Sequence, residues 1–260
     1  MLQLKLGIQL QSLRLPLRKA LLAAQQLGAA AVEVDARTEV RPQEFTGTAL
    51  RQLRKLLDDL NLRVGAVSFR TRHGYNVAEG LDARVAATKA AMKFAHDLGA
   101  AVVINQVGRV PDDETKSDWS LLVEVLRDLG HYGHHAGAWL AADTGSESGP
   151  SLARLVAALP VGALGVNLNP GNLIVNGFSP LEAVEALGGN VMHVHANDAV
   201  RDLARGRGLE TQLGRGAVDY PALLGALEEH DYRGYLTVER QAAEEPAHEI
   251  GQAIQYLRSL

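Results

Sequence analysis

Residues 138–169 read AWLAADTGSESGPSLARLVAALPVGALGVNLN, and this stretch holds the pattern that decides the fold. A short apolar run, Ala138–Asp143, is followed by a polar loop and by an Ala- and Leu-rich segment that begins near Ser148. A second apolar run, Leu164–Asn169, comes next. Apolar runs that alternate with segments of helical spacing are typical of strand–helix–strand units in a parallel sheet. The stretch therefore predicts one such unit.

The same pattern repeats along the whole chain. Further strands are predicted at Leu4–Leu10, Ala30–Asp35, Arg63–Phe69, Ala101–Val107, Val191–His195 and Tyr235–Glu239. Helices are predicted to begin near Pro16, Thr46, Leu81, Ser117, Ser148, Ser179, Asp219 and Pro246. Several of these starts carry a capping residue or an early proline. Eight strand–helix units close a barrel, so the sequence predicts a single α/β domain over residues 1–260, a (β/α)₈ TIM barrel.

A doubly wound open sheet is the alternative fold. Such a sheet places a glycine-rich phosphate turn directly after its first strand. Here the first predicted strand is followed by Gln11-Ser-Leu-Arg-Leu-Pro16, which lacks the spaced glycines. The barrel is therefore favoured.

Composition limits the classes of partner. The 260 residues are 47% hydrophobic and carry a formal net charge of −4, with no run of Lys or Arg, so neither nucleic acid nor a membrane is an expected partner. The absence of cysteine excludes disulfides and thiolate chemistry. Residues 1–13 alternate apolar and polar, and no apolar run reaches about 18 residues. We expect a cytoplasmic protein with a small-molecule ligand, and whether it forms a homo-oligomer stays open.

Polar side chains gather at the carboxyl ends of the predicted strands. Period-two alternation places these on inward faces: Glu33, Asp143, Asn169, His195 and Glu239. Buried groups of this kind destabilise a fold unless they are paired, hydrogen-bonded or bound to a metal. In barrels the usual cause is an active site, which lies at this end.

Four of these residues lie on the fifth to eighth strands, which are neighbours around a barrel. They are Asp143, Asn169, His195 and Glu239. Oxygen and imidazole donors in this mixture suit Mn²⁺, Mg²⁺, Co²⁺ or Zn²⁺. For any one residue the alternative is a satisfied polar network, with His195 simply hydrogen-bonded to Asp198. Four residues on consecutive strands favour a shared site.

Five segments carry a further pattern. They are Ala142-Asp-Thr-Gly145, Gly165-Val-Asn-Leu-Asn-Pro-Gly-Asn172, His193-Val-His-Ala-Asn-Asp198, Gly214-Arg-Gly-Ala-Val-Asp219 and Leu236-Thr-Val-Glu239. The HxHxxD, GxGxxD and terminal TxE motifs stand in an order and spacing that resembles the xylose-isomerase-like sugar isomerase/epimerase superfamily. The resemblance spans nearly the whole chain.

The resemblance implies a set of roles. In that superfamily acidic residues of the fifth, sixth and eighth strands and a seventh-strand His bind one divalent metal, and two Glu residues move protons. Carried over, the metal ligands are Asp143, Asn169, His195 and Glu239, and the catalytic pair is Asp143 and Glu239. Asp143 is a shortened acid, Asn169 replaces an Asp, and Asn172 stands where many relatives have His. With about one negative charge fewer, the site is expected to bind its metal weakly.

Substrate-binding candidates surround this set. Gln9 and Asn105 lie near the ends of the first and fourth strands, where they could recognise hydroxyl groups. The others are Glu33, Asn172, Asp198 and Arg207. Arg207 belongs to the Arg- and Gly-rich stretch from Arg201 to Arg215, a place where barrels often bind phosphate, although a solvated loop is an equal alternative.

Two other clusters are weighed against plainer explanations. His131, His134 and His135 lie at the end of the fourth predicted helix, away from the strand carboxyl ends, and are interpreted as surface residues that suit the helix dipole. Residues 70–75, with His73, form a candidate lid or a plain surface loop.

The leading hypothesis is a metal-dependent isomerase or epimerase of carbohydrate metabolism. It would act on a small keto-sugar or related hydroxy-carbonyl compound, through an enediolate. A dehydratase or lyase of the same superfamily and a non-catalytic sugar-binding barrel with a degraded metal site are the alternatives. A branch that cuts abasic DNA is set aside, because this chain lacks the His residues at strand ends and the positive charge.

Overall fold

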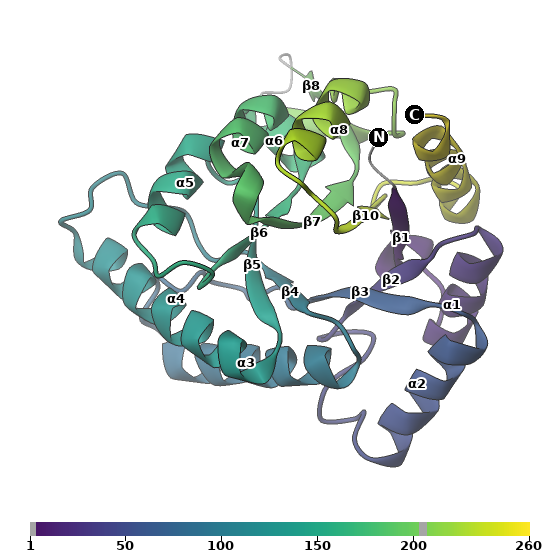
Figure 1. Cartoon of the computed structure of the whole chain (residues 1–260), viewed down its shortest axis with the longest axis horizontal. Coiled ribbons are helices and arrows are strands. Elements are labelled where there is room, and N and C mark those ends of the chain that lie inside the picture. Colours follow the sequence, from purple (N-terminus) through teal and green to yellow (C-terminus); the bar gives the residue numbers. More distant parts are fainter. Residues whose placement is uncertain (1–3, 203–206) are drawn as a thin grey trace.

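The computed structural model of the protein describes residues 4–202 and 207–260. A closed barrel of parallel strands lies at the centre, with helices around it (Figure 1). Its strands, in chain order, are β1 (Lys5–Gln9), β2 (Ala31–Asp35), β3 (Arg63–Ser68), β4 (Val102–Asn105), β5 (Trp139–Asp143), β6 (Gly165–Leu168), β7 (Val191–Ala196) and β10 (Tyr235–Val238). Pairing of β1 with β10 closes the ring. The predicted (β/α)₈ barrel is confirmed, and the open sheet is excluded.

The outer helices begin close to their predicted starts. They are α1 (Leu17–Gln26), α2 (Thr48–Asp59), α3 (Leu81–Asp97), α4 (Ser117–Ala136), α5 (Gly149–Ala157), α7 (Pro180–Leu187), α8 (Tyr220–Glu229) and α9 (Pro246–Ser259). The side chains of Ser148, Ser179 and Asp219 cap α5, α7 and α8, and a proline follows in the first turn of each. Both features favour helix initiation. Short 3₁₀ turns cover η1 (Leu10–Leu13) and η2 (Gly188–Asn190).

A short helix and a pair of antiparallel strands were not predicted. The short helix α6 (Pro170–Asn176) follows β6 directly, capped by the side chain of Asn169. The strands β8 (Asp198–Asp202) and β9 (Arg207–Thr211) pair antiparallel after β7. The stretch from Arg201 to Arg215, for which a solvated loop was an alternative, therefore contains much of a β-hairpin.

The inside of the barrel holds both apolar and polar side chains. Ala66, Val102, Ile104 and Ala141 form a small apolar cluster of their own, separate from the larger core between strands and helices. Other buried residues are polar: Gln9, Glu33, Asn167, His193 and His195 are all at most 4% exposed. Ala66 of the apolar cluster pairs in register with Glu33, so apolar and polar side chains share the inside of the barrel.

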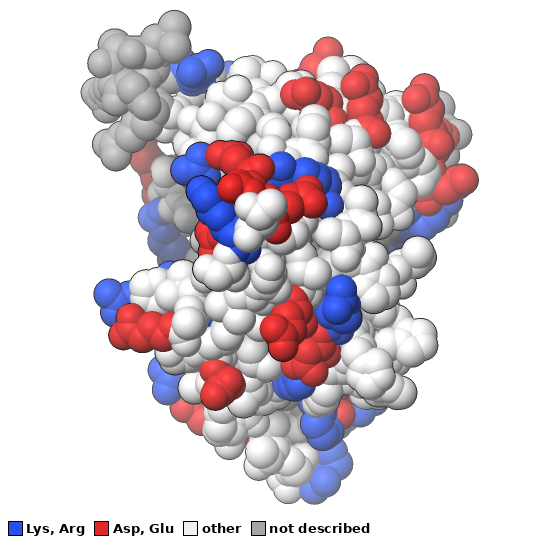
Figure 2. Space-filling model, turned by 90° about the vertical axis from the view of Figure 1, so that its left-hand side faces the viewer, with Lys and Arg blue, Asp and Glu red and all other residues white. Residues whose placement is uncertain are grey.

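On the face shown in Figure 2, acidic and basic side chains lie close together near the middle, while acidic side chains gather in the upper right part. Within the described parts of the chain, no helix combines the length and the apolar character needed to cross a membrane.

Candidate active site

The four residues with predicted metal-ligand roles meet at the carboxyl ends of the strands. Asp143 ends β5, Asn169 follows β6, His195 lies in β7 and Glu239 follows β10, and all are at most 4% exposed. The amide nitrogen of Asn169 is their common point. It lies 3.3 Å from Asp143 Oδ1, 3.2 Å from His195 Nδ1 and 3.2 Å from Glu239 Oε2. The barrel therefore brings all four side chains together.

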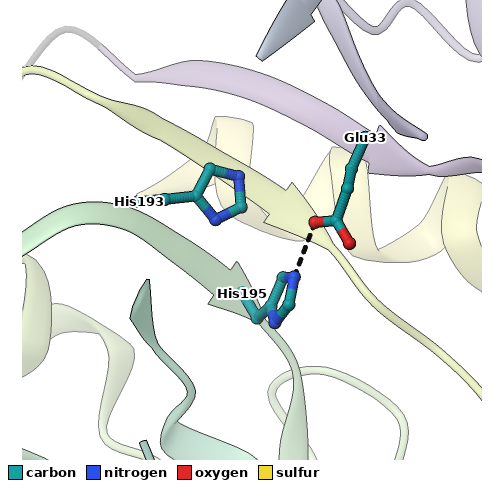
Figure 3. Close-up of side chains that lie close together, drawn as sticks. All are labelled: Glu33, His193 and His195. Atoms are coloured by element: carbon teal, nitrogen blue, oxygen red, sulfur yellow. Dashed lines mark hydrogen bonds and ion pairs between the residues drawn. The ribbon is translucent and has the colours of Figure 1, made fainter. Parts of the chain in front are cut away.

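His195 is bound on both sides of its ring. Its Nε2 lies 2.6 Å from Glu33 Oε2, the contact drawn in Figure 3 with His193 beside it. Its Nδ1 faces Glu239 Oε2 at 3.4 Å and Asp143 Oδ1 at 3.9 Å. The hydrogen-bond partner of His195 is therefore Glu33, in place of Asp198, which the sequence had suggested as an alternative.

In the pair of His195 and Glu33, each side chain stabilises the charged form of the other. Burial on its own would lower the pKa of His195, but the carboxylates of Glu33 and Glu239 raise it to about 9. Burial would raise the pKa of Glu33, but the charge of His195 and the hydrogen bond from it lower that pKa to about 2. His193 stays neutral, because burial and the charge of His195 lower its pKa to about 3.

Glu239 is a carboxylate surrounded by donors. They are Gln9 Nε2 at 3.2 Å, Arg70 Nη2 at 3.1 Å, Gln241 Nε2 at 2.6 Å, Asn169 Nδ2 at 3.2 Å and Asn197 Nδ2 at 2.8 Å. Burial raises its pKa, but the charges of His195 and Arg70 bring the pKa below its usual value. Hydrogen bonds of this number favour the ionised form.

Asp143 differs from Glu239 in one respect that matters chemically. Its Oδ1 accepts hydrogen bonds from Asn167 Nδ2 at 2.6 Å and Asn169 Nδ2 at 3.3 Å. Its Oδ2 is buried without a hydrogen-bond partner among the described residues, 3.8 Å from Arg70 Nη2. Burial raises the pKa of Asp143. A buried polar atom left without a partner indicates a position for a proton, a ligand or an ion.

A metal ion fits part of this arrangement. Glu33, His193 and His195 form a buried group whose ligand atoms lie within 4.8 Å of one another, which one ion could bridge. On the other side of the His195 ring, Asp143 has its free oxygen. A His that donates through one nitrogen to a carboxylate, as His195 does to Glu33, is typically oriented to bind a metal through the other.

Asn169 does not offer its oxygen to this group. Its Oδ1 accepts hydrogen bonds from Asn172 N at 3.1 Å and from Asn197 Nδ2 at 2.8 Å. The amide nitrogen therefore points at the carboxylates. On this side of the His195 ring the carboxylate and imidazole donors are Asp143, His195 and Glu239, whereas the group whose ligand atoms all lie within 4.8 Å of one another is Glu33, His193 and His195.

A polar pocket opens beside Glu239. It has a volume of about 200 Å³, and its lining includes Arg70, Asn172, Asn197, Glu210, Glu239 and Gln241. Pockets for drug-sized ligands usually measure about 300–1,000 Å³. This one suits a smaller and more polar molecule.

Of the remaining substrate-binding candidates, some line this pocket and others hold neighbouring residues in place. Asn172 lines the pocket, and Gln9 bridges Glu33 at 3.1 Å and Glu239 at 3.2 Å. Asn105 instead holds the loop after β3, through Thr71 N at 3.0 Å and Tyr75 Oη at 2.8 Å.

The last two substrate-binding candidates follow β7. Asp198 lines the pocket, but its two carboxylate oxygens accept from the backbone N–H groups of residues 199, 214, 216 and 218. The side chain of Arg207 lies outside what the structure describes.

Sequence reasoning did not assign roles to Arg70, Asn167, Asn197 and Gln241. Arg70 belongs to the segment that was considered a candidate lid, and its position directly after β3 was a usable signal. Asn167 shares the inward face of β6 with Asn169. His131 and His135, with Nε2 atoms 3.3 Å apart, are exposed on α4 at the other end of the barrel.

Comparisons with known proteins agree with this architecture. The family model described as xylose isomerase-like TIM barrel matches residues 21–260. An inosose dehydratase of Geobacillus kaustophilus (strain HTA426) is 25% identical over 186 residues, 60% of this chain and 60% of that protein. An inosose dehydratase of Clostridium beijerinckii (strain ATCC 51743 / NCIMB 8052) is 24% identical over 234 residues, 75% of this chain and 74% of that protein. The chain thus spans 60% of the first relative, which is less than two thirds of its length.

Solved structures resemble the chain over nearly its full length. A xylose isomerase domain protein from Planctomyces limnophilus has a TM-score of 0.83 and 27% identity, over 92% of this chain and 91% of that one. The IOLI protein with a bound zinc atom has a TM-score of 0.79 and 18% identity, over 98% of this chain and 96% of that one. D-allulose 3-epimerase from Methylomonas sp., in complex with D-allulose, has a TM-score of 0.78 and 16% identity, over 100% and 98%. The last two share the fold.

Proposed function

The chain belongs to the xylose isomerase-like TIM barrel family, and we propose that it is an enzyme that moves a proton at the carbon next to a carbonyl in a small polyhydroxylated ketone. The observation that carries this proposal is the contrast between two buried carboxylates. Glu239 is held by donors, whereas Asp143 Oδ2 has no partner among the described residues. Two titratable groups driven apart by their surroundings are the usual mark of an acid–base pair.

The proposed chemistry uses both carboxylates. Glu239 takes the proton from the carbon next to the carbonyl, and the electron pair of that C–H bond forms the double bond of an enediolate. Asp143 then delivers a proton. Delivery to the same carbon from the opposite face gives an epimer, and delivery to the other carbon of the enediolate double bond moves the carbonyl group and gives an isomer. Protonation of a hydroxyl group one carbon further on releases water and gives a dehydrated product.

The oxyanion would be stabilised by groups already in position. Arg70 Nη2 lies 3.1 Å from Glu239 Oε1 and also lines the pocket, so a substrate oxygen beside Glu239 would meet the guanidinium. The amide nitrogen of Asn169 is a second donor, on the other oxygen of Glu239 at 3.2 Å. Donors fixed in a buried site stabilise developing charge strongly, because they need little reorganisation.

A divalent ion is part of the proposal. Asp143, His195 and Glu239 would hold it, with Glu33 fixing the orientation of the His195 ring. When bound, such an ion supplies Lewis-acid polarisation of a carbonyl oxygen. Mn²⁺, Mg²⁺, Co²⁺ and Zn²⁺ all suit these donors, and binding is expected to be weak because Asn169 brings no charge.

Dehydration is the second candidate outcome, and the two curated relatives favour it, since both are named inosose dehydratase. Isomerisation or epimerisation is favoured by structural neighbours such as the D-allulose 3-epimerase. The two outcomes share the enediolate and differ only in the last step.

The test is incubation of the protein with a panel of ketohexoses and inososes in D₂O, followed by proton NMR. We expect loss of a C–H signal next to the carbonyl, with either an isomeric sugar or a dehydrated, ultraviolet-absorbing product. Samples with chelator and with added Mn²⁺ separate the metal requirement from the proton transfer. Binding of these compounds with neither exchange nor product would contradict the proposal and favour the non-catalytic barrel.

A further inference from the structure

A second cavity lies outside the candidate active site. It has a volume of about 420 Å³ and is built by the segments that follow β2 and β3, together with the first turns of α3. Five of its lining residues are basic, namely Arg37, Arg41, Arg72, His73 and Arg84, and none is acidic. Since the whole chain has a net charge of −4, this is a local concentration of positive charge against the overall balance. We call it the arginine cavity.

The guanidinium groups of this cavity are largely unneutralised. Arg37 donates to the carbonyl oxygen of Arg70 at 3.0 Å. Arg84 donates to the carbonyl oxygens of Glu79 and Val77, and its Nε is buried without a hydrogen-bond partner among the described residues. In the described part of the chain, these five residues form one ion pair. It joins Arg41 to Glu44 at 3.0 Å and is exposed to solvent.

The walls of the arginine cavity are held in place before any ligand arrives. Asp35 Oδ1 accepts from the backbone N–H of Arg37 at 2.9 Å and of Thr38 at 2.7 Å, which fixes the turn after β2. Asn105 Oδ1 accepts from Thr71 N at 3.0 Å and fixes the segment after β3. Preorganisation of this kind lowers the entropy lost on binding.

The floor of the cavity is apolar. Phe69 is 8% exposed, and the Arg37 guanidinium lies over its ring at 5.7 Å from the centroid. Ala36, Ala83 and Ala87 are further apolar residues of the cavity lining. A ligand here would place its carbon skeleton against this surface and its charge against the arginines.

The arginine cavity shares a wall with the active site. Phe69 and Thr71 line the cavity, while Arg70 between them lines the polar pocket and contacts Glu239. Arg37 is bonded to the carbonyl oxygen of that same residue. A ligand bound by Arg37 would therefore affect the position of the segment that holds Arg70.

We propose that the arginine cavity is a binding site for a phosphate group carried by a small organic molecule. Phosphate matches the fork geometry of arginine and carries the charge that several unneutralised guanidinium groups require. The group belongs either to the distal end of the substrate or to a separate phosphorylated effector that acts through Arg70.

The first experiment measures binding without turnover. Inorganic phosphate is titrated by calorimetry into the protein and into the double variant Arg37→Gln/Arg72→Gln, at fixed ionic strength. The dissociation constant for phosphate should rise at least tenfold in the double variant. The matched control is Arg63→Gln, an exposed arginine at the other end of β3. Thermal melts check that all variants fold. No phosphate binding, or equal loss in the control, overturns the proposal.

The second experiment identifies the source of the phosphate. If the substrate carries it, the single variant Arg72→Gln, which keeps the contact between Arg37 and Arg70, raises KM for a phosphorylated ketose and leaves that of the unphosphorylated sugar unchanged. If an effector carries it, added inorganic phosphate changes the turnover of the unphosphorylated sugar in the parent and not in the double variant. The binding experiment does not depend on the proposed reaction, so the two can fail separately. Phosphate binding with neither kinetic effect, in an active enzyme, overturns the link to the active site.

Discussion

Asn169 occupies the centre of the candidate site, and two separate demands fix its orientation. Its Oδ1 caps α6 by accepting from Asn172 N, and it also accepts from Asn197 Nδ2. Its Nδ2 is consequently turned toward the carboxylates of Asp143 and Glu239. The amide thus gives these two carboxyl groups a shared hydrogen-bond donor.

Replacing Asn169 by Asp should change metal affinity and stability together. The added carboxylate supplies charge and a ligand oxygen, so the dissociation constant for Mn²⁺ should fall at least ~10-fold, equivalent to ~1.4 kcal/mol. Without metal the same carboxylate repels Asp143 and Glu239, so the apoprotein should be less stable than the parent. Calorimetric Mn²⁺ titration and urea unfolding at neutral pH measure the two effects. If neither changes, Asn169 does not face a cation site.

The ion pair of Glu33 and His195 sets a pH dependence of stability. The folded-state pKa of His195 is raised from 6.5 to about 9, so its contribution is complete below about pH 6.5 and is lost as the pH rises through 9. The folded-state pKa of Glu33 is lowered from 4.5 to about 2, so its contribution is complete above about pH 4.5 and is lost as the pH falls toward 2.

Glu33→Gln should therefore flatten the alkaline side of the stability profile. The parent should lose stability between about pH 6.5 and pH 9, and the variant should lose much less there. Thermal unfolding at intervals from pH 5 to pH 10 measures this, with the exposed Glu44→Gln as control. Parallel profiles for the parent and Glu33→Gln would show that Glu33 does not hold the proton on His195.

Individual residues differed in how well the sequence predicted their positions. Asp143, His195 and Glu239 lie at or directly after strand ends, and strand periodicity alone indicated that they face inward. Arg70 and Gln241 reach Glu239 from loops, where no periodicity specifies a direction. Their positions depend on the path of the loop, which only the folded chain defines.

Among the elements, the β8–β9 hairpin is tied to the turn that follows it by the side chain of Asp198. Asp198, 1% exposed, accepts backbone hydrogen bonds from residue 199 and from three residues of the turn after β9: Gly214 at 3.0 Å, Gly216 at 2.8 Å and Val218 at 3.1 Å. This holds the hairpin and the turn beside the pocket. Asp198 is therefore better explained as a support of the site than as a residue that binds substrate directly.

Asp198→Ala should lower the free energy of unfolding by about 2–3 kcal/mol, because several buried N–H groups lose their acceptor. Asp198→Asn, which keeps one carbonyl oxygen, should lie between the variant and the parent. Urea denaturation followed by circular dichroism gives both values. A loss below about 0.5 kcal/mol, the scale of an ordinary surface substitution, would be inconsistent with this role.

The predicted strands and outer helices agree with the structure because each carries a strong local signal. Barrel strands are buried on both faces and read as apolar runs, and capped helices carry Ser, Asp or Pro at their start. The helix α6 is only seven residues long and starts within a motif assigned to a strand end. The hairpin contains Arg and Gly in place of alternating apolar residues, so neither element had a recognisable pattern.

At the scale of the whole molecule, the barrel brings distant parts of the sequence to one point. Glu33 and His195 are 162 positions apart and Arg70 and Glu239 are 169 apart, yet each pair is in direct contact. The sequence could predict this convergence only through the closed fold, since strand order around the barrel decides which ends are neighbours. The chemical role of the assembled group is the central claim.

The measurement that tests this claim most directly uses the ketone of the panel on which the parent protein is active. It is the rate at which the Glu239→Gln variant exchanges solvent deuterium into that ketone. The substitution keeps the size of the side chain and removes its capacity to take a proton. We expect exchange to fall by at least about 100-fold relative to the parent, with circular dichroism and thermal unfolding little changed. Exchange at the parent rate in a folded Glu239→Gln protein would contradict the account, because the proposed base would then have no part in the reaction.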